Sequence, residues 1–83
     1  MEENPLVSII VPTYNRKDFL PINLKSLLNQ TYKNIEIIVV NDHGEDVSNI
    51  INGFNDNRIK YIVNEKNLGL AGSRNVGIKQ SNG

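Results

Sequence analysis

The sequence contains no cysteine, and its positive and negative charges balance. Without cysteine, the chain can form no disulfide, no thiolate nucleophile and no cysteine-ligated zinc site. Nine basic and nine acidic residues give zero formal net charge. This balance argues against a nucleic-acid-binding protein, because binding to phosphates needs an excess of basic residues.

Long hydrophobic runs are also missing. No stretch approaches the roughly 18 apolar residues that a membrane span requires. The first five residues are acidic and contain no apolar run of signal-peptide length. We therefore expect a cytoplasmic protein without a membrane segment, and a length of 83 residues allows one small domain.

Isoleucine and valine are abundant, at 11 and 7 of the 83 residues, against a single alanine. Such β-branched residues favour strands over a helical bundle. Three short apolar runs, at residues 7–11, 35–40 and 59–63, are bounded by Asn, Asp, Gly or Pro and are predicted to be strands. The first two are almost continuously apolar, which is typical of strands covered on both faces.

Helical patterns separate these strands. An apolar stripe along residues 20–28 predicts a helix, with Asp18 as its N-cap and Pro21 in its first turn. A second stripe covers residues 47–54. A third helix is expected from Leu70 to Ser81, where two glycines lower the helix propensity. The order βαβαβα predicts an α/β fold, a three-layer open parallel sheet with right-handed crossovers.

Candidate binding residues follow the strands. Ligands of open α/β sheets bind at the carboxyl ends of the strands, and the loops there are residues 12–16, 41–44 and 64–75. Neither the glycine pattern of a dinucleotide fold nor that of a P-loop occurs. Tyr14 can instead stack on a base, beside the carboxamide of Asn15 and the guanidinium of Arg16. Asp42 can accept a hydrogen bond from a base or ribose, and Arg74 can pair with a phosphate.

These residues also have purely structural interpretations. Asp42 can be an Asx-turn residue, Tyr14 a half-buried edge aromatic, and Arg74 a solvated helix charge. His43 fits a turn, and the small residues at positions 69, 71 and 72 can permit close packing of a helix on the sheet. The residue types alone leave both interpretations open.

Four segments resemble family-2 glycosyltransferases of the GT-A fold, in that family's order and spacing. They are residues 7–16 (VSIIVPTYNR), 27–32 (LLNQTY), 36–42 (EIIVVND) and 67–78 (NLGLAGSRNVGI). The resemblance implies a nucleotide-binding half in which Pro12, Thr13 and Tyr14 lie against the base, Asp42 contacts the base or ribose, and Arg74 lies near the nucleotide. It implies a nucleotide-diphosphate sugar of the UDP type as donor, whose sugar the parent enzyme transfers to an acceptor hydroxyl.

The sequence departs from the family pattern in two places. His43-Gly44-Glu45 stands where the family more often has Asp-Gly-Ser, which leaves the contacts of that loop unpredicted. The family's next strand, with its metal-binding D-x-D motif, and its catalytic base do not occur in these residues. We therefore expect residues 1–83 to be a truncated domain that is inactive alone. It would lack catalytic residues, metal ligands and cofactors, with Mg²⁺ or Mn²⁺ needed only in the full-length parent.

The same truncation affects the sheet. Without the family's fourth strand, the strand from Val7 to Val11 becomes an edge, and an uncharged apolar edge is a template for pairing with another chain. We therefore expect self-association or fraying there. Two other functions stay open: a non-catalytic nucleotide-binding module, and a structural or interaction domain of flavodoxin-like topology.

Overall fold

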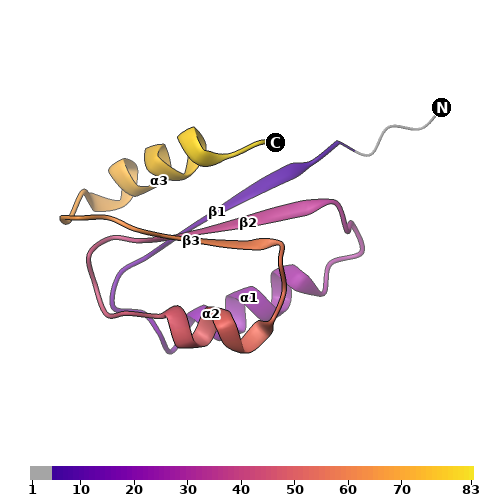
Figure 1. Cartoon of the computed structure of the whole chain (residues 1–83), viewed down its shortest axis with the longest axis horizontal. Helices are drawn as coiled ribbons and strands as arrows, with labels where there is room; N and C mark the ends of the chain where they lie inside the picture. Colours follow the sequence, from indigo (N-terminus) through magenta and orange to yellow (C-terminus); the bar gives the residue numbers. More distant parts are fainter. Residues whose placement is uncertain (1–4) are drawn as a thin grey trace.

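The computed structural model describes residues 5–83. Its three parallel strands form one sheet in the order β1-β2-β3. Helices α1 and α2 cover one face of this sheet, and α3 covers the other (Figure 1). The predicted three-layer βαβαβα fold is therefore confirmed. In chain order the elements are β1 (Val7–Thr13), α1 (Leu20–Leu28), β2 (Ile35–Asn41), α2 (Ser48–Phe54), β3 (Ile59–Val63) and α3 (Gly69–Gln80).

The central strand β2 forms the core of the fold. All seven of its residues are buried, and Ile35, Ile37 and Val39 pack against α1 and α2 as part of one hydrophobic cluster. The alternate residues face α3, because successive side chains of a strand point to opposite faces of the sheet. Coverage of both faces explains why this run of sequence is almost continuously apolar.

β1 lies at the edge of the sheet, as expected, but it is longer than predicted. It continues through Pro12 to Thr13, whose carbonyl accepts a hydrogen bond from the backbone N–H of Asp42 at 2.9 Å. The odd-numbered residues of β1 direct their backbone groups toward β2, so Pro12 faces the free edge. There its missing N–H removes no ladder hydrogen bond, and the strand need not end at the proline.

The start of α1 differs from the prediction. Phe19, not Asp18, occupies the N-cap position, and no side chain caps the helix. The backbone N–H groups of Phe19 and Leu20 both donate to the Arg16 carbonyl, at 3.0 and 3.1 Å. The turn gives the first helical N–H group an acceptor, and the next residue, Pro21, has no N–H to satisfy. Asp18 therefore caps nothing and remains exposed. The expected position of Pro21 in the first turn is confirmed.

Close packing of α3 on the sheet occurs at Gly77. A Cβ atom at this position would lie 2.5 Å from Cγ2 of Ile10 in β1, so only glycine fits without displacement. The sequence also allowed such packing at residues 69, 71 and 72, but a Cβ at Gly69 would meet no other residue, and one at Gly72 would meet the side chain of Leu68 and not the sheet. Across residues 5–83, the structure has no helix with the length and apolarity needed to cross a membrane.

Candidate functional site

A cavity of about 240 Å³ lies where the loops after β1 and β2 meet the start of α3. The carboxyl ends of the strands lie together on the left in Figure 1, as parallel strands require. The cavity contains four of the seven residues predicted for a nucleotide site. Its lining consists of Pro12, Thr13, Tyr14, Asp42, Asn67, Gly69, Leu70 and Ser73.

Asp42 is buried at the base of this site. Its carboxylate accepts hydrogen bonds from the backbone N–H groups of Leu68 at 2.6 Å and Gly69 at 2.8 Å. It also accepts one from the Asn64 carboxamide at 2.9 Å, which donates to the Ser73 hydroxyl as well, at 3.1 Å. The Leu68 N–H, foremost, holds the pKa of Asp42 below its usual value, against the opposing effect of burial. The Asx-turn interpretation is therefore wrong, because the partners of this carboxylate come from distant parts of the chain.

Tyr14 forms one rim of the cavity, and its side chain is 49% exposed. The neighbouring Asn15 fastens the first loop to the second, because its side-chain oxygen accepts a hydrogen bond from the backbone N–H of Glu45 at 2.8 Å. Gly44 permits this approach, since a Cβ there would lie 2.8 Å from Asn15 Oδ1 and 3.1 Å from Tyr14 Cδ1. Asn15 thus makes one of the loop contacts that the sequence left unpredicted.

Both predicted arginines lie outside the cavity lining. The Arg16 guanidinium stacks over the Phe19 ring, 4.2 Å from its centroid, and lines a neighbouring hollow of about 250 Å³. Arg74 is exposed on α3. Sequence reasoning missed the lining residues Asn67, Gly69, Leu70 and Ser73. Their only signal is that they follow the third strand, which does not distinguish them from Arg74.

His43 is a turn residue, as expected, with a φ of 64° in the left-handed region. Its Nδ1 lies 3.3 Å from the Asn64 carbonyl oxygen. The residue before this turn is Asn41, which the sequence did not single out. The buried Asn41 carboxamide donates to the Glu45 carbonyl at 2.6 Å and accepts from the Gly44 N–H at 2.8 Å. Asn41 thereby shapes the loop beside the cavity.

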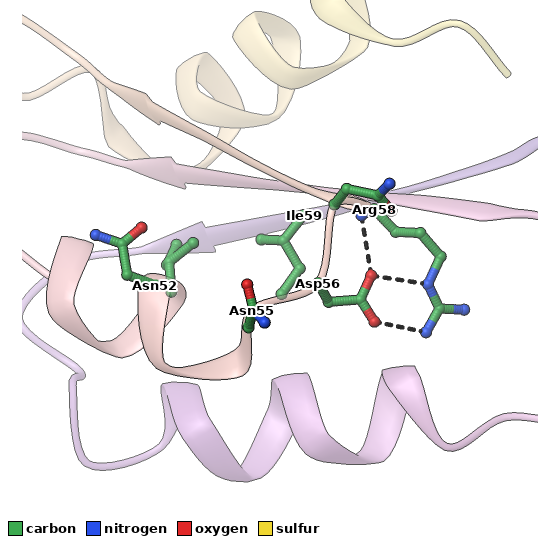
Figure 2. A pocket seen from close by; sticks show the side chains of 7 residues that line it. Asn52, Asn55, Asp56, Arg58 and Ile59 are labelled. Atoms are coloured by element: carbon green, nitrogen blue, oxygen red, sulfur yellow. Dashed lines mark hydrogen bonds and ion pairs between the residues drawn. The ribbon is translucent and has the colours of Figure 1, made fainter.

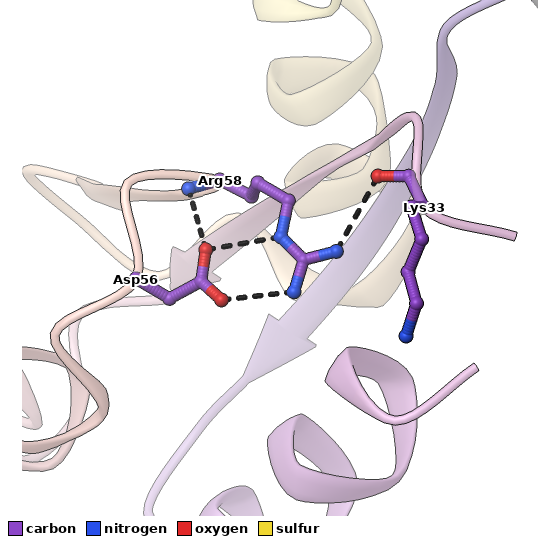
Figure 3. Close-up of polar contacts among 3 residues, drawn as sticks. All are labelled: Lys33, Asp56 and Arg58. Atoms are coloured by element: carbon purple, nitrogen blue, oxygen red, sulfur yellow. Dashed lines mark hydrogen bonds and ion pairs between the residues drawn. The ribbon is translucent and has the colours of Figure 1, made fainter. Parts of the chain in front are cut away.

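A second and larger cavity, of about 760 Å³, opens at the opposite end of the sheet, beside the start of β3 (Figure 2). Asp56 and Arg58 dominate its polar chemistry, with Nε–Oδ1 and Nη2–Oδ2 distances of 3.0 and 2.9 Å. Arg58 lowers the pKa of Asp56, and Asp56 raises that of Arg58. The guanidinium also reaches the Lys33 carbonyl at 3.4 Å (Figure 3). These groups satisfy one another and join two loops, so we assign them a structural role.

The strand-end cavity can be compared with known proteins. Residues 8–83 match the sequence model of the family described as Glycosyl transferase family 2. The chain belongs to this family. It is 43% identical to an uncharacterized glycosyltransferase of Haemophilus influenzae, over 94% of this chain and 25% of that protein. It is 47% identical to the Escherichia coli UDP-Glc:alpha-D-GlcNAc-diphosphoundecaprenol beta-1,3-glucosyltransferase WfaP, over 94% of this chain and 32% of that protein.

This family-2 chain therefore spans about a quarter to a third of the length of these curated relatives. Among solved structures, it is similar to the mannosyltransferase PcManGT of Pyrobaculum calidifontis in complex with GDP-Man and Mn²⁺. The TM-score is 0.80 at 23% identity, over 90% of this chain and 24% of the other. That likeness concerns the fold, and it agrees with the GT-A architecture expected from the sequence.

Residues 5–83 of this family-2 chain do not by themselves fit a divalent cation. Within the part of the chain that the structure describes, no group of three or more His, Cys, Asp or Glu residues could hold a metal ion. Asp42, the acid in the cavity, already accepts hydrogen bonds from the start of α3. Metal ligands of an Mg²⁺ or Mn²⁺ site are mostly carboxylates and other oxygens, and Asp42 alone supplies too few.

Proposed function

We propose that this chain holds the nucleoside part of a nucleotide-diphosphate sugar in the strand-end cavity. The observation that carries the proposal is the meeting of Thr13, Tyr14 and Asp42 around one cavity at the carboxyl edge of the sheet. Open α/β sheets bind ligands at this edge. In the same family fold, PcManGT was solved with GDP-Man, and WfaP is named for UDP-Glc.

The lining suits a nucleoside because it offers an exposed aromatic ring beside small and polar groups. Tyr14 can stack on the face of a base, while Thr13 and Asn67 present a hydroxyl and a carboxamide to the polar edges of the base or the ribose. The volume of about 240 Å³ is below that of a site for a drug-sized ligand. We therefore propose that only the nucleoside lies in it, with the diphosphate and sugar directed outward past Arg74.

We further propose that this chain, on its own, does not transfer sugar. Transfer to an acceptor hydroxyl needs a base for the hydroxyl proton and stabilisation of the departing diphosphate. The sequence contains no D-x-D motif, and Asp42 is engaged with neutral donors. In this proposal, the parent enzyme transfers the sugar, and the present residues bind its donor.

An NMR titration tests the nucleotide site. We expect millimolar UDP to shift the amide signals of Thr13, Tyr14 and Asp42, equally with Mg²⁺ and with EDTA. Tyr14→Ala should weaken binding about tenfold, because stacking of an aromatic ring on a base contributes about 1–3 kcal/mol. Phe19→Ala is the matched control, since Phe19 is 47% exposed yet lies outside the cavity. Absence of shifts with both UDP and GDP would leave only an α/β interaction domain.

The free edge of β1 supports a second, independent proposal, which is self-association of this chain through that strand. Two hollows of about 250 and 330 Å³ lie beside this strand, between β1 and α1. At the start of the strand, Gly83 lies against this side and its N–H donates to Ser8 Oγ at 2.8 Å. A further strand would therefore pair with the outward backbone groups of Ile10 and Pro12. Light scattering over a concentration series should show growth in mean mass, and a constant monomer mass with slow amide exchange along β1 would contradict it.

A further inference from the structure

The hydroxyl group of Tyr61, in β3, makes three hydrogen bonds at the loop between β2 and α2. It accepts from Asn41 Nδ2 at 2.9 Å and from the backbone N–H of Val47 at 3.2 Å. It donates to Asp46 Oδ1 at 3.3 Å. A tyrosine hydroxyl has one hydrogen to donate and two lone pairs, so these three bonds use its whole capacity.

The sheet brings this hydroxyl to the loop because Tyr61 and Asn41 share one face. Asn41 follows Val39 on the face of β2 that packs against α1 and α2, since alternate residues of a strand point the same way. Tyr61 is paired with Val39 in the register of the sheet, and its ring packs against the same hydrophobic cluster. The phenol and the carboxamide therefore meet at the end of this apolar face.

Asn41 extends the connection from Tyr61 to the backbone of the loop. Its side chain is buried, and its Nδ2 also donates to the Glu45 carbonyl at 2.6 Å. Its Oδ1 accepts from the Gly44 N–H at 2.8 Å. A buried amide hydrogen without an acceptor is costly. Without the Tyr61 hydroxyl, one hydrogen of this amide would lose its acceptor, which disfavours the present orientation of the carboxamide.

The loop of residues 43–47 in turn supports the cavity rim at Tyr14. A Cβ atom at Gly44 would lie 3.1 Å from Tyr14 Cδ1, so the loop backbone lies against the tyrosine ring. The Glu45 N–H donates to Asn15 Oδ1 at 2.8 Å. Asn15 and His43 have φ angles of 52° and 64°, in the left-handed region. Such conformations persist where surrounding contacts fix them, and here the two loops supply contacts to each other.

We propose that Tyr61 is a positioning residue of the nucleotide site, whose hydroxyl orients Asn41 and so holds the loop of residues 43–47 against Tyr14. This inference rests on the proposed function, in which Tyr14 stacks on the base. Tyr61 is not part of the cavity lining and acts through these neighbours. It keeps the ring of Tyr14 in place before the ligand arrives, which reduces the ordering cost of binding.

The variant Tyr61→Phe tests this role, because it removes the hydroxyl and keeps the ring in the core. UDP should bind about fivefold more weakly, and amide exchange at Glu45 should accelerate about fivefold. In the free protein, the NMR signals of the Tyr14 ring should shift.

Tyr32→Phe is the matched control for this variant. The Tyr32 ring packs against the same hydrophobic cluster, and its hydroxyl donates to the Pro5 carbonyl, before the start of β1 and away from the cavity. Both variants should lose stability, since each loses a hydrogen bond of the tyrosine hydroxyl. Only the variant at Tyr61 should change UDP affinity and the signals of Tyr14.

Two results would overturn the proposal: unchanged UDP affinity in Tyr61→Phe, or an equal loss of affinity in Tyr32→Phe. If Tyr61→Phe does not fold, amide exchange in the unaltered chain decides. The N–H groups of Gly44, Glu45 and Val47 should exchange at least about tenfold more slowly than in an unstructured peptide, and rapid exchange there would contradict a fixed loop. If UDP does not bind the unaltered chain, the proposed function fails, while the Tyr14 signals and Glu45 exchange still test the link from Tyr61.

Discussion

The two ends of α3 are held by two carboxylates that lie near opposite ends of β2, on the same side of the sheet. Asp42, directly after β2, holds the residues at the start of α3. Glu36, near the beginning of β2, accepts a hydrogen bond from the Asn82 N–H, just beyond the end of α3, at 2.5 Å. Both side chains are buried, yet their partners differ in kind.

Glu36 is paired with a cation, whereas Asp42 is held by neutral donors. Lys60 Nζ lies 2.7 Å from Glu36 Oε1, and Ser8 donates to the other carboxylate oxygen. Chiefly through Lys60, these contacts lower the pKa of Glu36 to about 2. At the cavity, backbone and amide N–H groups take the place of the lysine. The carboxylate at the start of β2 is thus neutralised by a lysine. The carboxylate beside the cavity keeps its negative charge and is held in place by neutral N–H donors.

The largest effect on stability is expected from a substitution that moves α3 away from both Asp42 and Glu36. Gly77 lies between the two ends of α3, and in Gly77→Ala the new methyl group would meet Ile10 Cγ2 at 2.5 Å. The displacement of α3 from the sheet should lower the free energy of unfolding by about 2 kcal/mol. It should also speed amide exchange along the whole helix. Urea denaturation measures the first quantity and NMR the second.

Gly53→Ala provides the matched control for this prediction. Gly53 is also a helix-interior glycine, but a Cβ there has open space around it. We expect that change to raise stability by about 0.5–1 kcal/mol, through helix propensity alone. If both alanines have the same effect, contact with Ile10 does not determine how α3 packs.

The next largest effect concerns the pH dependence of stability, to which Glu36 contributes. Because the folded-state pKa of Glu36 is about 2, below the ordinary 4.5, its ionised form stabilises the fold above pH 4.5. That contribution is lost as the pH falls from 4.5 toward 2. Glu36→Gln should cost about 1 kcal/mol near neutral pH, because Lys60 is 44% exposed and water screens the pair.

Urea midpoints between neutral pH and pH 3 check this prediction. The variant should lose less stability on acidification than the unaltered chain, although Asp42, Asp46 and Asp56 also have lowered pKa values and leave a residual slope. Equal slopes for the two proteins would show that Glu36 does not hold the far end of α3.

The smallest effect is expected at the start of α1, which has no carboxylate corresponding to Asp42. Asp18→Ala should change the free energy of unfolding by less than about 0.5 kcal/mol, because Asp18 is exposed and caps nothing. Thermal unfolding followed by circular dichroism measures it. If the free energy of unfolding fell by about 1 kcal/mol, the usual effect of deleting an N-cap, Asp18 would be the N-cap after all.

Sequence reasoning succeeded where the signal is local. The β-branched runs and apolar stripes place all six elements within a few residues, because periodicity records which face of an element is covered. Pro12 and Asp18 mark where this reasoning fails. Whether a proline ends a strand depends on which side of the sheet is free, and whether an aspartate caps a helix depends on the turn before it.

The candidate site was predictable to a similar degree. The sequence locates the loops at the strand ends, and Thr13, Tyr14 and Asp42 do line one cavity. It does not separate Asn67 and Ser73 from Arg74, since all three lie in the segment that follows β3. The turn of α3 decides that Ser73 faces the sheet and Arg74 the solvent, while Asn67 lies in the loop before that helix.

The amino-acid sequence alone determined the α/β class, the family, and the exclusion of cysteine chemistry. Each of these follows from composition or from the order of segments along the chain. Only the tertiary structure decided that Gly77 meets Ile10, and that Asp42 and Glu36 hold opposite ends of α3. Such contacts join residues tens of positions apart, so they exist only after the crossovers bring β1, β2 and α3 together.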